Sequence, residues 1–190
     1  MIRIGILGDI GSGKTYVSKN FGFPVFNADI EVNKLYDRDK KIFNKLKKKL
    51  PKYFFSFPIN KKEVINAILG DEKNLKKIVQ IVHKEIRKKL RLFLIKNKSS
   101  KIVILDIPLL LENKINNQND ILVFVKSKKS DILKRLNKRK NFNKKLINQF
   151  KNIQLPLDYK KNNAQFIIKN DFKKRTVSKY VKDILKKVLK

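Results

Sequence analysis

Eight residues near the start of the chain, GDIGSGKT at positions 8–15, constrain this sequence more than any other segment. They fit the pattern G-x-x-x-x-G-K-[ST], and they lie between an apolar run that suits a buried strand and a stretch that suits a short helix. The alternative is a glycine turn followed by a lysine that is there by chance. Such a turn would not need a strand before it and a helix after it, so the context favours the motif. The sequence therefore predicts a P-loop, in which backbone N–H groups surround the phosphates of a nucleotide.

Each residue type in this loop has its own task in binding a nucleotide. The glycines let the backbone turn its N–H groups toward one anion, where the helix N-terminus adds about half a positive charge. The ammonium of Lys14 would reach the β- and γ-phosphates, and the hydroxyl of Thr15 would bind Mg²⁺. The residues expected to hold the nucleotide are Gly11, Ser12, Gly13, Lys14, Thr15 and Tyr16. GTPases, helicases, ATPases and small-molecule kinases share this motif, so it does not identify the acceptor.

Apolar runs and helical patterns alternate along the rest of the chain. The runs that predict buried strands are 2–7, 24–27, 101–106, 120–125 and 165–169. Helical patterns cover about 30–50, a stretch from residue 60 or 61 to the break at Gly70, and the C-terminus. From Glu72 onward apolar residues recur at three- and four-residue steps, which predicts a long amphipathic helix. This order of elements predicts an α/β fold with a parallel sheet.

The composition excludes several kinds of chemistry. The chain has no cysteine, which excludes disulfides, thiolate catalysis and cysteine-based zinc sites. It has one histidine, His83, so a histidine-cluster metal centre is excluded as well, and any metal must have oxygen ligands. Asp106 is the candidate ligand, because it ends an apolar strand at the position where Walker-B carboxylates bind Mg²⁺ directly or through water.

The formal charge of +32, from 48 lysines and arginines against 16 acidic residues, would ordinarily indicate a nucleic acid or an anionic membrane as partner. The excess is nearly all lysine, in a chain also rich in Asn, Ile and Phe, as AT-biased codons would produce. We interpret it as a lysine-coated surface that attracts small polyanions, and we expect no specific nucleic acid and no obligate protein partner. Because no apolar run approaches the roughly 20 residues that a bilayer requires, we expect a cytoplasmic protein without membrane contact.

Four further stretches resemble, in order, the dephospho-CoA kinase family. They are NADIEVN at 27–33, IVHKEI at 81–86, LDIPLLLEN at 105–113, and a last group with LKRLNKRKN at 133–141, NIQLPLDYKK at 152–161 and IIKND near the end. The resemblance implies transfer of the γ-phosphate of ATP to the ribose 3′-hydroxyl of dephospho-CoA, with ATP and Mg²⁺ as cofactors. The segment from about 37 to 75 contributes little to it.

The first stretch resembles the D-A-D segment of the family, in which the second aspartate accepts the proton of the acceptor hydroxyl. That aspartate corresponds to Asp29, and a carboxylate near the P-loop suits phosphoryl transfer to an alcohol. The first aspartate of the family is Asn27 here, and an arginine or histidine four residues after the base is Asn33. Without the resemblance, Asp29 is better explained as the N-cap of a helix.

The second and third stretches imply residues on the substrate side. His83 matches the histidine of the family's H-P-x-I pattern, although Lys84 stands for the proline, and a lone histidine on a long helix is more often structural. Pro108 and Glu112 match the family's P-L-L-x-E pattern and are expected to act in substrate binding, together with Asp106 as Mg²⁺ ligand. The leucines between them, 109–111, are better explained as core residues.

The last group resembles a lid and the adenine end of the family's nucleotide site. Arg135 and Arg139 would lie on one helix face and meet the transferring phosphate or the base when the lid closes, whereas judged alone they suit a solvated basic surface. Gln154 and Lys160 match a glutamine and a basic residue of the family's lid. Asn170 falls where the family commonly has an asparagine near the adenine.

The patterns above predict an α/β fold with a P-loop core and a parallel sheet. The resemblance implies a member of the dephospho-CoA kinase family, with five strands in that sheet, a helical substrate-binding insertion and a lid. The boundaries that the resemblance implies are about 1–29, 99–129 and 161–190 for the core, 30–98 for the helical CoA-binding region and 130–160 for the lid. Catalysis would depend on Asp29, Lys14 and Arg139. Another P-loop kinase, for a nucleoside or a nucleoside monophosphate, is the first alternative, and a nucleic-acid-stimulated ATPase is the second. A GTPase would need an N-K-x-D segment, which this sequence lacks.

Overall fold

The computed structural model describes residues 1–138 and 143–190. The chain divides into two compact units. One, called the core unit here, consists of the described residues of Met1–Asn27, Leu94–Phe142 and Leu155–Lys190. The other, called the helical unit, consists of Ala28–Phe93 and Asn143–Gln154. The chain therefore leaves the core unit directly after the second strand, and leaves it again between residues 142 and 143.

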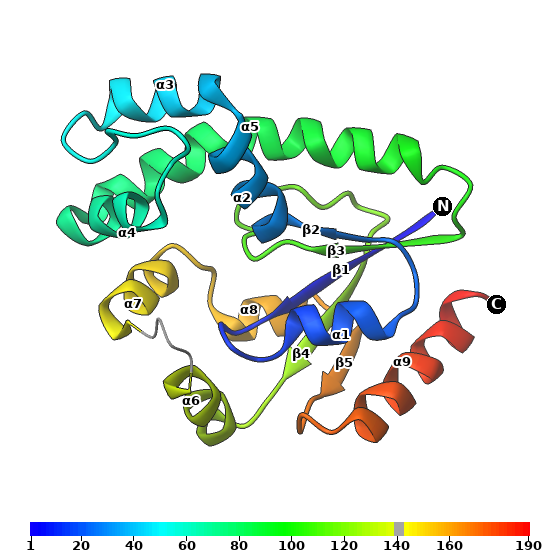
Figure 1. Cartoon of the computed structure of the whole chain (residues 1–190). Helices are drawn as coiled ribbons and strands as arrows, with labels where there is room; N and C mark the ends of the chain where they lie inside the picture. Colours follow the sequence, from blue (N-terminus) through cyan, green and yellow to red (C-terminus); the bar gives the residue numbers. More distant parts are fainter. Residues whose placement is uncertain (139–142) are drawn as a thin grey trace. The chain divides into compact units, whose positions relative to one another are not determined.

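The core unit is built on a parallel sheet in which each strand is one of the predicted apolar runs (Figure 1). The strands are β1 (Ile2–Gly8), β2 (Val25–Asn27), β3 (Ile102–Asp106), β4 (Ile121–Lys126) and β5 (Phe166–Lys169), in the order β2-β3-β1-β4-β5. All pairings are parallel, so the carboxyl ends of the strands meet at one edge of the sheet. The predicted α/β class and five-stranded parallel sheet are confirmed.

Four helices complete the core unit: α1 (Lys14–Asn20), α6 (Lys129–Asn137), α8 (Leu157–Asn162) and α9 (Lys174–Val188). Apolar side chains of β1, β3, β4 and β5 pack with α1 and α9 in one buried cluster, in which Ile4, Val17 and Val177 are fully buried. Leu110 is also fully buried and packs against β1, where a Cβ on Gly5 would come within 2.5 Å of its Cδ2. The segment after β3 is thus fixed to the sheet by a close contact that only glycine permits.

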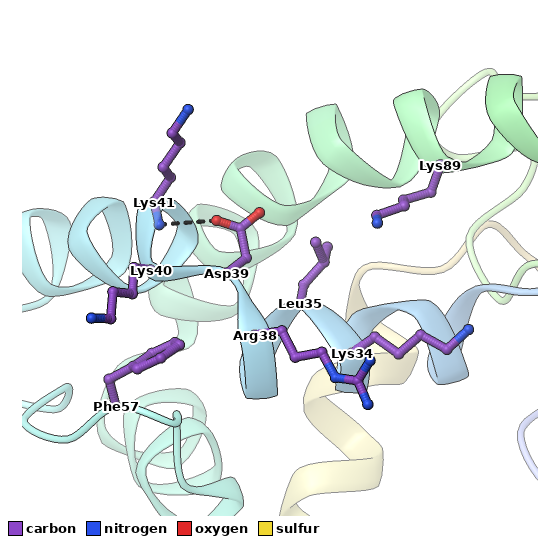
Figure 2. A pocket seen from close by; sticks show the side chains of 8 residues that line it. All are labelled: Lys34, Leu35, Arg38, Asp39, Lys40, Lys41, Phe57 and Lys89. Atoms are coloured by element: carbon purple, nitrogen blue, oxygen red, sulfur yellow. Dashed lines mark hydrogen bonds between the residues drawn. The ribbon is translucent and has the colours of Figure 1, made fainter.

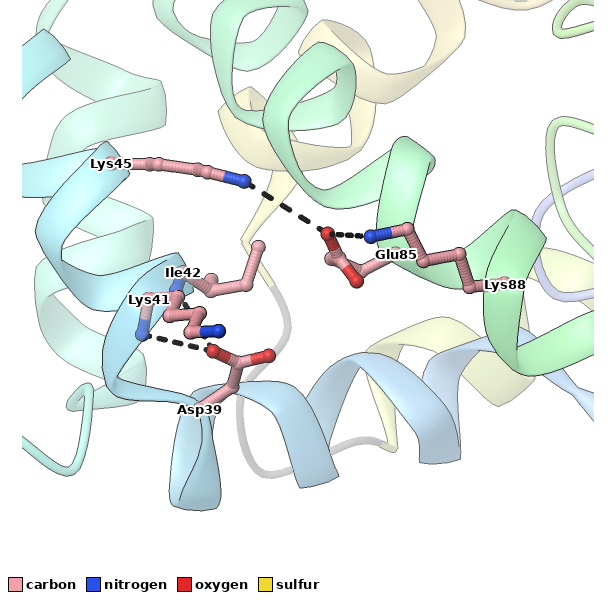
Figure 3. Close-up of polar contacts among 6 residues, drawn as sticks. All are labelled: Asp39, Lys41, Ile42, Lys45, Glu85 and Lys88. Atoms are coloured by element: carbon pink, nitrogen blue, oxygen red, sulfur yellow. Dashed lines mark hydrogen bonds and ion pairs between the residues drawn. The ribbon is translucent and has the colours of Figure 1, made fainter.

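The helical unit contains α2 (Ala28–Arg38), α3 (Lys40–Lys49), α4 (Lys61–Gly70), most of α5 (Glu72–Lys96) and α7 (Lys144–Asn152). The long α5 agrees with the predicted amphipathic pattern, but the helical stretch 30–50 is two helices. Asp39 has an extended backbone between them, and its carboxylate accepts the N–H groups of Lys41 and Ile42 at 2.9 and 3.1 Å (Figure 3). It is therefore the N-cap that starts α3 and separates it from α2.

An ion-pair cluster joins α3 to α5 within the helical unit. Glu85 on α5 accepts the ammonium of Lys88 at 3.0 Å, and Lys45 of α3 lies 3.9 Å from the same carboxylate oxygen (Figure 3). Both lysines are more than half exposed, so solvent screens these pairs and they contribute little to stability. Among the helices of the described residues, none is long and apolar enough to cross a membrane.

Candidate active site

The P-loop connects β1 to α1, as the sequence predicts, and its glycines carry the conformations that it needs. Gly13, the N-cap of α1, has a φ of 92°, which side chains other than hydrogen rarely allow. A Cβ at this position would also clash with the side-chain amide of Asn170. At Gly8 a Cβ would come within 2.7 Å of the carbonyl oxygen of Val125 on the neighbouring strand. The loop therefore follows a path that only glycine can take at these two positions.

Side chains from two neighbouring strand ends hold the P-loop backbone in place. The carbonyl oxygen of Ser12 accepts a hydrogen bond from the hydroxyl of Ser127, just after β4, and another from the Nδ2 of Asn170, just after β5, each at 2.9 Å. The ammonium of Lys14 lies over the loop, where it donates to the carbonyl oxygens of Gly8 and Asp9 at 3.1 and 2.8 Å. Because the backbone is fixed before any ligand binds, its N–H groups need little reorganisation to receive an anion.

The first turn of α1 follows the loop and carries the remaining predicted nucleotide contacts. Thr15 and Tyr16 are exposed, and the backbone N–H groups of a first helical turn have no acceptor within the helix. The hydroxyl of Ser12 is buried and has no hydrogen-bond partner within residues 1–138 and 143–190. These groups are suited to phosphate oxygens, which accept several hydrogen bonds each. Their contacts with a nucleotide stay predictions.

Asp106 and Asn27 end neighbouring strands and are directly paired across the sheet. The Nδ2 of Asn27 donates to the Oδ2 of Asp106 at 2.5 Å, and the Asp106 residue is 3% exposed. A carboxylate at the end of β3 and the Thr15 hydroxyl at the start of α1 provide hard oxygen donors, which is the chemistry that Mg²⁺ prefers. No group of three or more acidic or histidine side chains in the described part of the chain could hold a metal alone. The donors present therefore fit an ion that arrives with the phosphates of its nucleotide.

Replacing Asn27 with alanine should lower the free energy of unfolding by about 1–3 kcal/mol, because a buried carboxylate would lose its donor. Urea unfolding followed by circular dichroism measures this change. Asn33→Ala, the other asparagine that departs from the family pattern, is the control, because Asn33 is exposed and should change stability by less than about 0.5 kcal/mol. Equal effects of the two substitutions would contradict the role assigned to the Asn27–Asp106 bond.

Asp29, the predicted base, is the second residue of α2 and belongs to the helical unit. Its side chain is exposed in the first turn, where a negative charge is stabilised by the helix dipole. The interpretation of Asp29 as an N-cap is wrong, since the helix already begins at Ala28. Asp29 and the P-loop belong to separate units, and its approach to the nucleotide stays a prediction.

His83 lies on α5, also in the helical unit, and is half-buried. Its Nε2 is buried without a hydrogen-bond partner in the described residues. Burial, and then the charge of Arg87, lower the pKa of His83 below its usual value, so the imidazole is neutral at neutral pH. An unpaired imidazole nitrogen is costly for a purely structural histidine. The role of His83 in substrate binding stays a prediction, and a hydrogen bond from Nε2 to the substrate would remove this cost.

Glu112, predicted to bind substrate, makes its main contacts inside the core unit. Its Oε1 accepts the ammonium of Lys160 at 2.7 Å and the backbone N–H of Leu155 at 3.0 Å. The Lys160 side chain is 1% exposed and that of Glu112 is 8% exposed. Leu155 is the first residue of the core unit after the chain returns from the helical unit. The Oε2 of Glu112 has no partner among the residues that the structure describes, so a substrate contact through this atom stays a prediction.

The burial of the segment between β3 and Glu112 agrees only in part with the prediction. Leu110 is fully buried, as expected of a core residue, whereas Leu109, Leu111 and Pro108 are half-buried. This half-buried proline follows the last residue of β3, Asp106, by two positions, at the edge of the sheet where the strand ends. This placement is compatible with the predicted substrate contact of Pro108, which stays a prediction.

Arg135 and Asn170, predicted nucleotide contacts, both have partners around the P-loop. The guanidinium carbon of Arg135 lies 4.1 Å from the ring centroid of Phe172, and Asn170 holds the Ser12 carbonyl as described. Arg139 lies outside the described residues. The supporting roles of Ser127 and Phe172 were not predicted, and no motif around either residue indicates them.

A cavity of about 630 Å³ opens on the helical unit (Figure 2). Most of its lining side chains are cationic; the lining comprises Lys34, Leu35, Arg38, Asp39, Lys40, Lys41, Phe57 and Lys89. Several of these charges are already engaged or turned away. Lys34 pairs with Glu31 at 2.6 Å, and the ammonium groups of Lys40 and Lys41 point in different directions in Figure 2. We therefore assign no ligand to this cavity, since its cations do not converge on one point.

The fold and the braced loop define a P-loop nucleotide-binding protein, and solved structures share this architecture. The crystal structure of TT1252 from Thermus thermophilus superposes with a TM-score of 0.78 at 24% identity, over 98% of this chain and 97% of that one. The dephospho-CoA kinase from Campylobacter jejuni gives a TM-score of 0.62 at 19% identity, over 98% and 96%. At these identities the likeness establishes the fold.

The sequence comparisons establish the family within that class. The family model for dephospho-CoA kinase, CoaE, matches residues 2–175. A dephospho-CoA kinase of Wolbachia pipientis wMel is 34% identical over 187 residues, which cover 96% of this chain and 95% of the relative. One from Wolbachia sp. subsp. Brugia malayi is 32% identical over the same shares. The chain belongs to the dephospho-CoA kinase family and is an ATP-dependent phosphotransferase, as the sequence analysis predicted.

Proposed function

We propose that this protein transfers the γ-phosphate of Mg-ATP to the ribose 3′-hydroxyl of dephospho-CoA in the cytoplasm, as the last step of CoA biosynthesis. The observation that carries the proposal is the complete P-loop, held by side chains that directly follow β4 and β5, in a chain whose residues 2–175 match the model of this family. Asn170 is one of those side chains, so this predicted nucleotide contact also supports the loop itself.

The P-loop would contribute mainly position and charge. Phosphoryl transfer requires little covalent chemistry from the protein, so a fixed backbone and well-placed cations account for most of the catalysis. On binding ATP, the ammonium of Lys14 would exchange its loop carbonyl acceptors for phosphate oxygens. Mg²⁺, held through Thr15 and Asp106 with the phosphates, would supply further positive charge. Arg135 would add a second protein cation near the loop.

The helical unit would supply the general base for the reaction and one of the groups that bind the acceptor. The 3′-oxygen of dephospho-CoA forms a bond to the γ-phosphorus while the bond from that phosphorus to the bridging oxygen breaks, and ADP leaves. The proton of the hydroxyl passes to the carboxylate of Asp29, which acts as general base. The Nε2 of His83 and the Oε2 of Glu112 have no hydrogen-bond partner among the residues that the structure describes. These two atoms and Pro108 are the groups proposed to contact the acceptor. No nucleic acid, membrane or protein partner takes part.

A substrate screen coupled to ADP release tests this function. The purified chain with Mg-ATP should release ADP with dephospho-CoA and form CoA, identified by mass spectrometry. It should not do so with adenosine, uridine or AMP, and Lys14→Ala should abolish turnover by removing the cation that binds the β- and γ-phosphates. Phosphorylation of AMP or a nucleoside in place of dephospho-CoA would favour another kinase activity. Release of ADP only in the presence of RNA would favour a nucleic-acid-stimulated ATPase.

A further inference from the structure

The loop between β5 and α9 is held firmly against the P-loop. The Nδ2 of Asn170 donates to the Ser12 carbonyl, and its Oδ1 accepts the backbone N–H of Phe172 at 2.9 Å. Asp171 accepts the N–H of Lys173 at 3.0 Å and the hydroxyl of Thr176 at 2.9 Å. The position of Phe172 is therefore fixed by hydrogen bonds on both sides of it in the chain.

Phe172 has a backbone conformation that disfavours its own side chain. Its φ is 64°, in the left-handed region where glycine and asparagine are common and a bulky residue is strained. A strained phenylalanine persists only where the surroundings enforce it, and such residues gather at functional sites. The ring should therefore make a contact that a glycine could not.

The ring of Phe172 joins the P-loop to Arg135. A Cβ at Gly13 would lie 3.2 Å from Cε1 of the ring, so the ring reaches the glycine that precedes Lys14. The guanidinium carbon of Arg135 lies 4.1 Å from the ring centroid, within the range of a cation–π contact. The helix that carries Arg135 packs on the same loop, because a Cβ at Gly11 would be 3.1 Å from side-chain atoms of Ile132 and Leu136.

A guanidinium stacked on a ring keeps its hydrogen-bond donors available. The contact uses the face of the planar group, while its N–H donors lie around the edge. Arg135 is exposed and makes no ion pair with a carboxylate in residues 1–138 and 143–190. An arginine that no other side chain supports samples many rotamers at the surface and loses conformational entropy when it binds a phosphate. Stacking on the ring restricts these rotamers before binding, so less entropy is lost.

We propose that Phe172 is a positioning residue, which holds Arg135 beside the P-loop with its donor edge free for the phosphates of the bound nucleotide. The inference rests on the proposed function only in that ATP binds at the P-loop. It does not depend on the identity of the acceptor.

Nucleotide binding to the full chain tests the proposal without turnover. Isothermal titration with Mg-AMP-PNP should show that Phe172→Leu, which keeps an apolar side chain but loses the ring, weakens binding about threefold to tenfold. Phe172→Tyr, which keeps the ring, should bind as the wild type does. Phe166→Leu is the matched control, because Phe166 is a partly buried phenylalanine of β5 whose side chain packs on the core. It should leave the affinity unchanged.

The link to Arg135 is tested by a double-mutant cycle. Arg135→Ala should weaken binding at least as much as Phe172→Leu, and the double variant should be no weaker than Arg135→Ala alone. Binding of adenosine, which has no phosphates, should be unchanged in every variant. Wild-type affinity in Phe172→Leu, additive losses in the double variant, or an equal loss for adenosine would each overturn the proposal. Thermal unfolding of each variant shows whether it is folded. These binding measurements need no acceptor, so they remain informative even if the protein does not phosphorylate dephospho-CoA.

Discussion

Replacing Lys160 with methionine is expected to lower the free energy of unfolding by about 3–5 kcal/mol. Methionine keeps the length of the side chain but removes the ammonium that lies 2.7 Å from Glu112. Both side chains are almost fully buried, so the Glu112 carboxylate would stay in the interior without its counter-charge. It would retain the N–H of Leu155, but one neutral donor does not compensate for an ionised group in a poorly solvated site. Urea unfolding followed by circular dichroism measures the loss.

Two further variants distinguish the buried pair from a general effect of losing a lysine. Lys161→Met changes the next residue, which is half-exposed, and should alter stability by less than about 0.5 kcal/mol. The double variant Lys160→Met with Glu112→Leu removes both charges and should recover much of the loss, because no unpaired charge remains. A double variant less stable than Lys160→Met, or a Lys160→Met protein as stable as the wild type, would contradict the assignment.

The elements that the sequence predicted correctly are those encoded by contiguous patterns. Each strand of the sheet is a short, mostly apolar run, the P-loop lies within eight residues, and α5 repeats its apolar positions over many turns. The break at Asp39 was not predicted, because the charged residues on both sides suit a helix. Only the backbone shows that its carboxylate caps the second helix. Local patterns therefore predict the fold well and the boundaries of polar helices poorly.

The supporting contacts of the site could not be predicted, because they join residues far apart in the chain. Lys160 is one lysine among very many, and no local pattern shows that it is buried against Glu112. The pairing of Asn27 with Asp106 depends on the register of β2 against β3. The positive φ of Phe172 could not be predicted either, because glycine or asparagine is the usual residue in that conformation. The sequence thus predicts which residues meet the ligands, while the structure shows what holds those residues in place.

The Asp29→Asn variant is expected to lose about a hundredfold or more of its turnover with dephospho-CoA, which is typical for the loss of a general base. Asparagine has nearly the same size as aspartate but cannot accept the proton of the acceptor hydroxyl at neutral pH. Affinity for Mg-AMP-PNP should stay within about twofold of the wild type, because nucleotide binding depends on the P-loop. Steady-state rates coupled to ADP release, together with titration of the analogue, measure the two quantities separately.

Glu31→Gln is the matched control for this prediction. Glu31 is the other acidic residue in the first turn of α2, and it pairs with Lys34 at 2.6 Å. Its replacement removes a negative charge from the same end of the helix, so it reproduces any effect of the helix dipole on folding or on the field of the site. Turnover of Glu31→Gln should therefore remain close to that of the wild type. Similar losses of turnover in both variants would show that negative charge at the start of α2, and not proton acceptance by Asp29, supports the reaction. Full turnover in Asp29→Asn would show that Asp29 is not the general base, although the protein would still be a kinase.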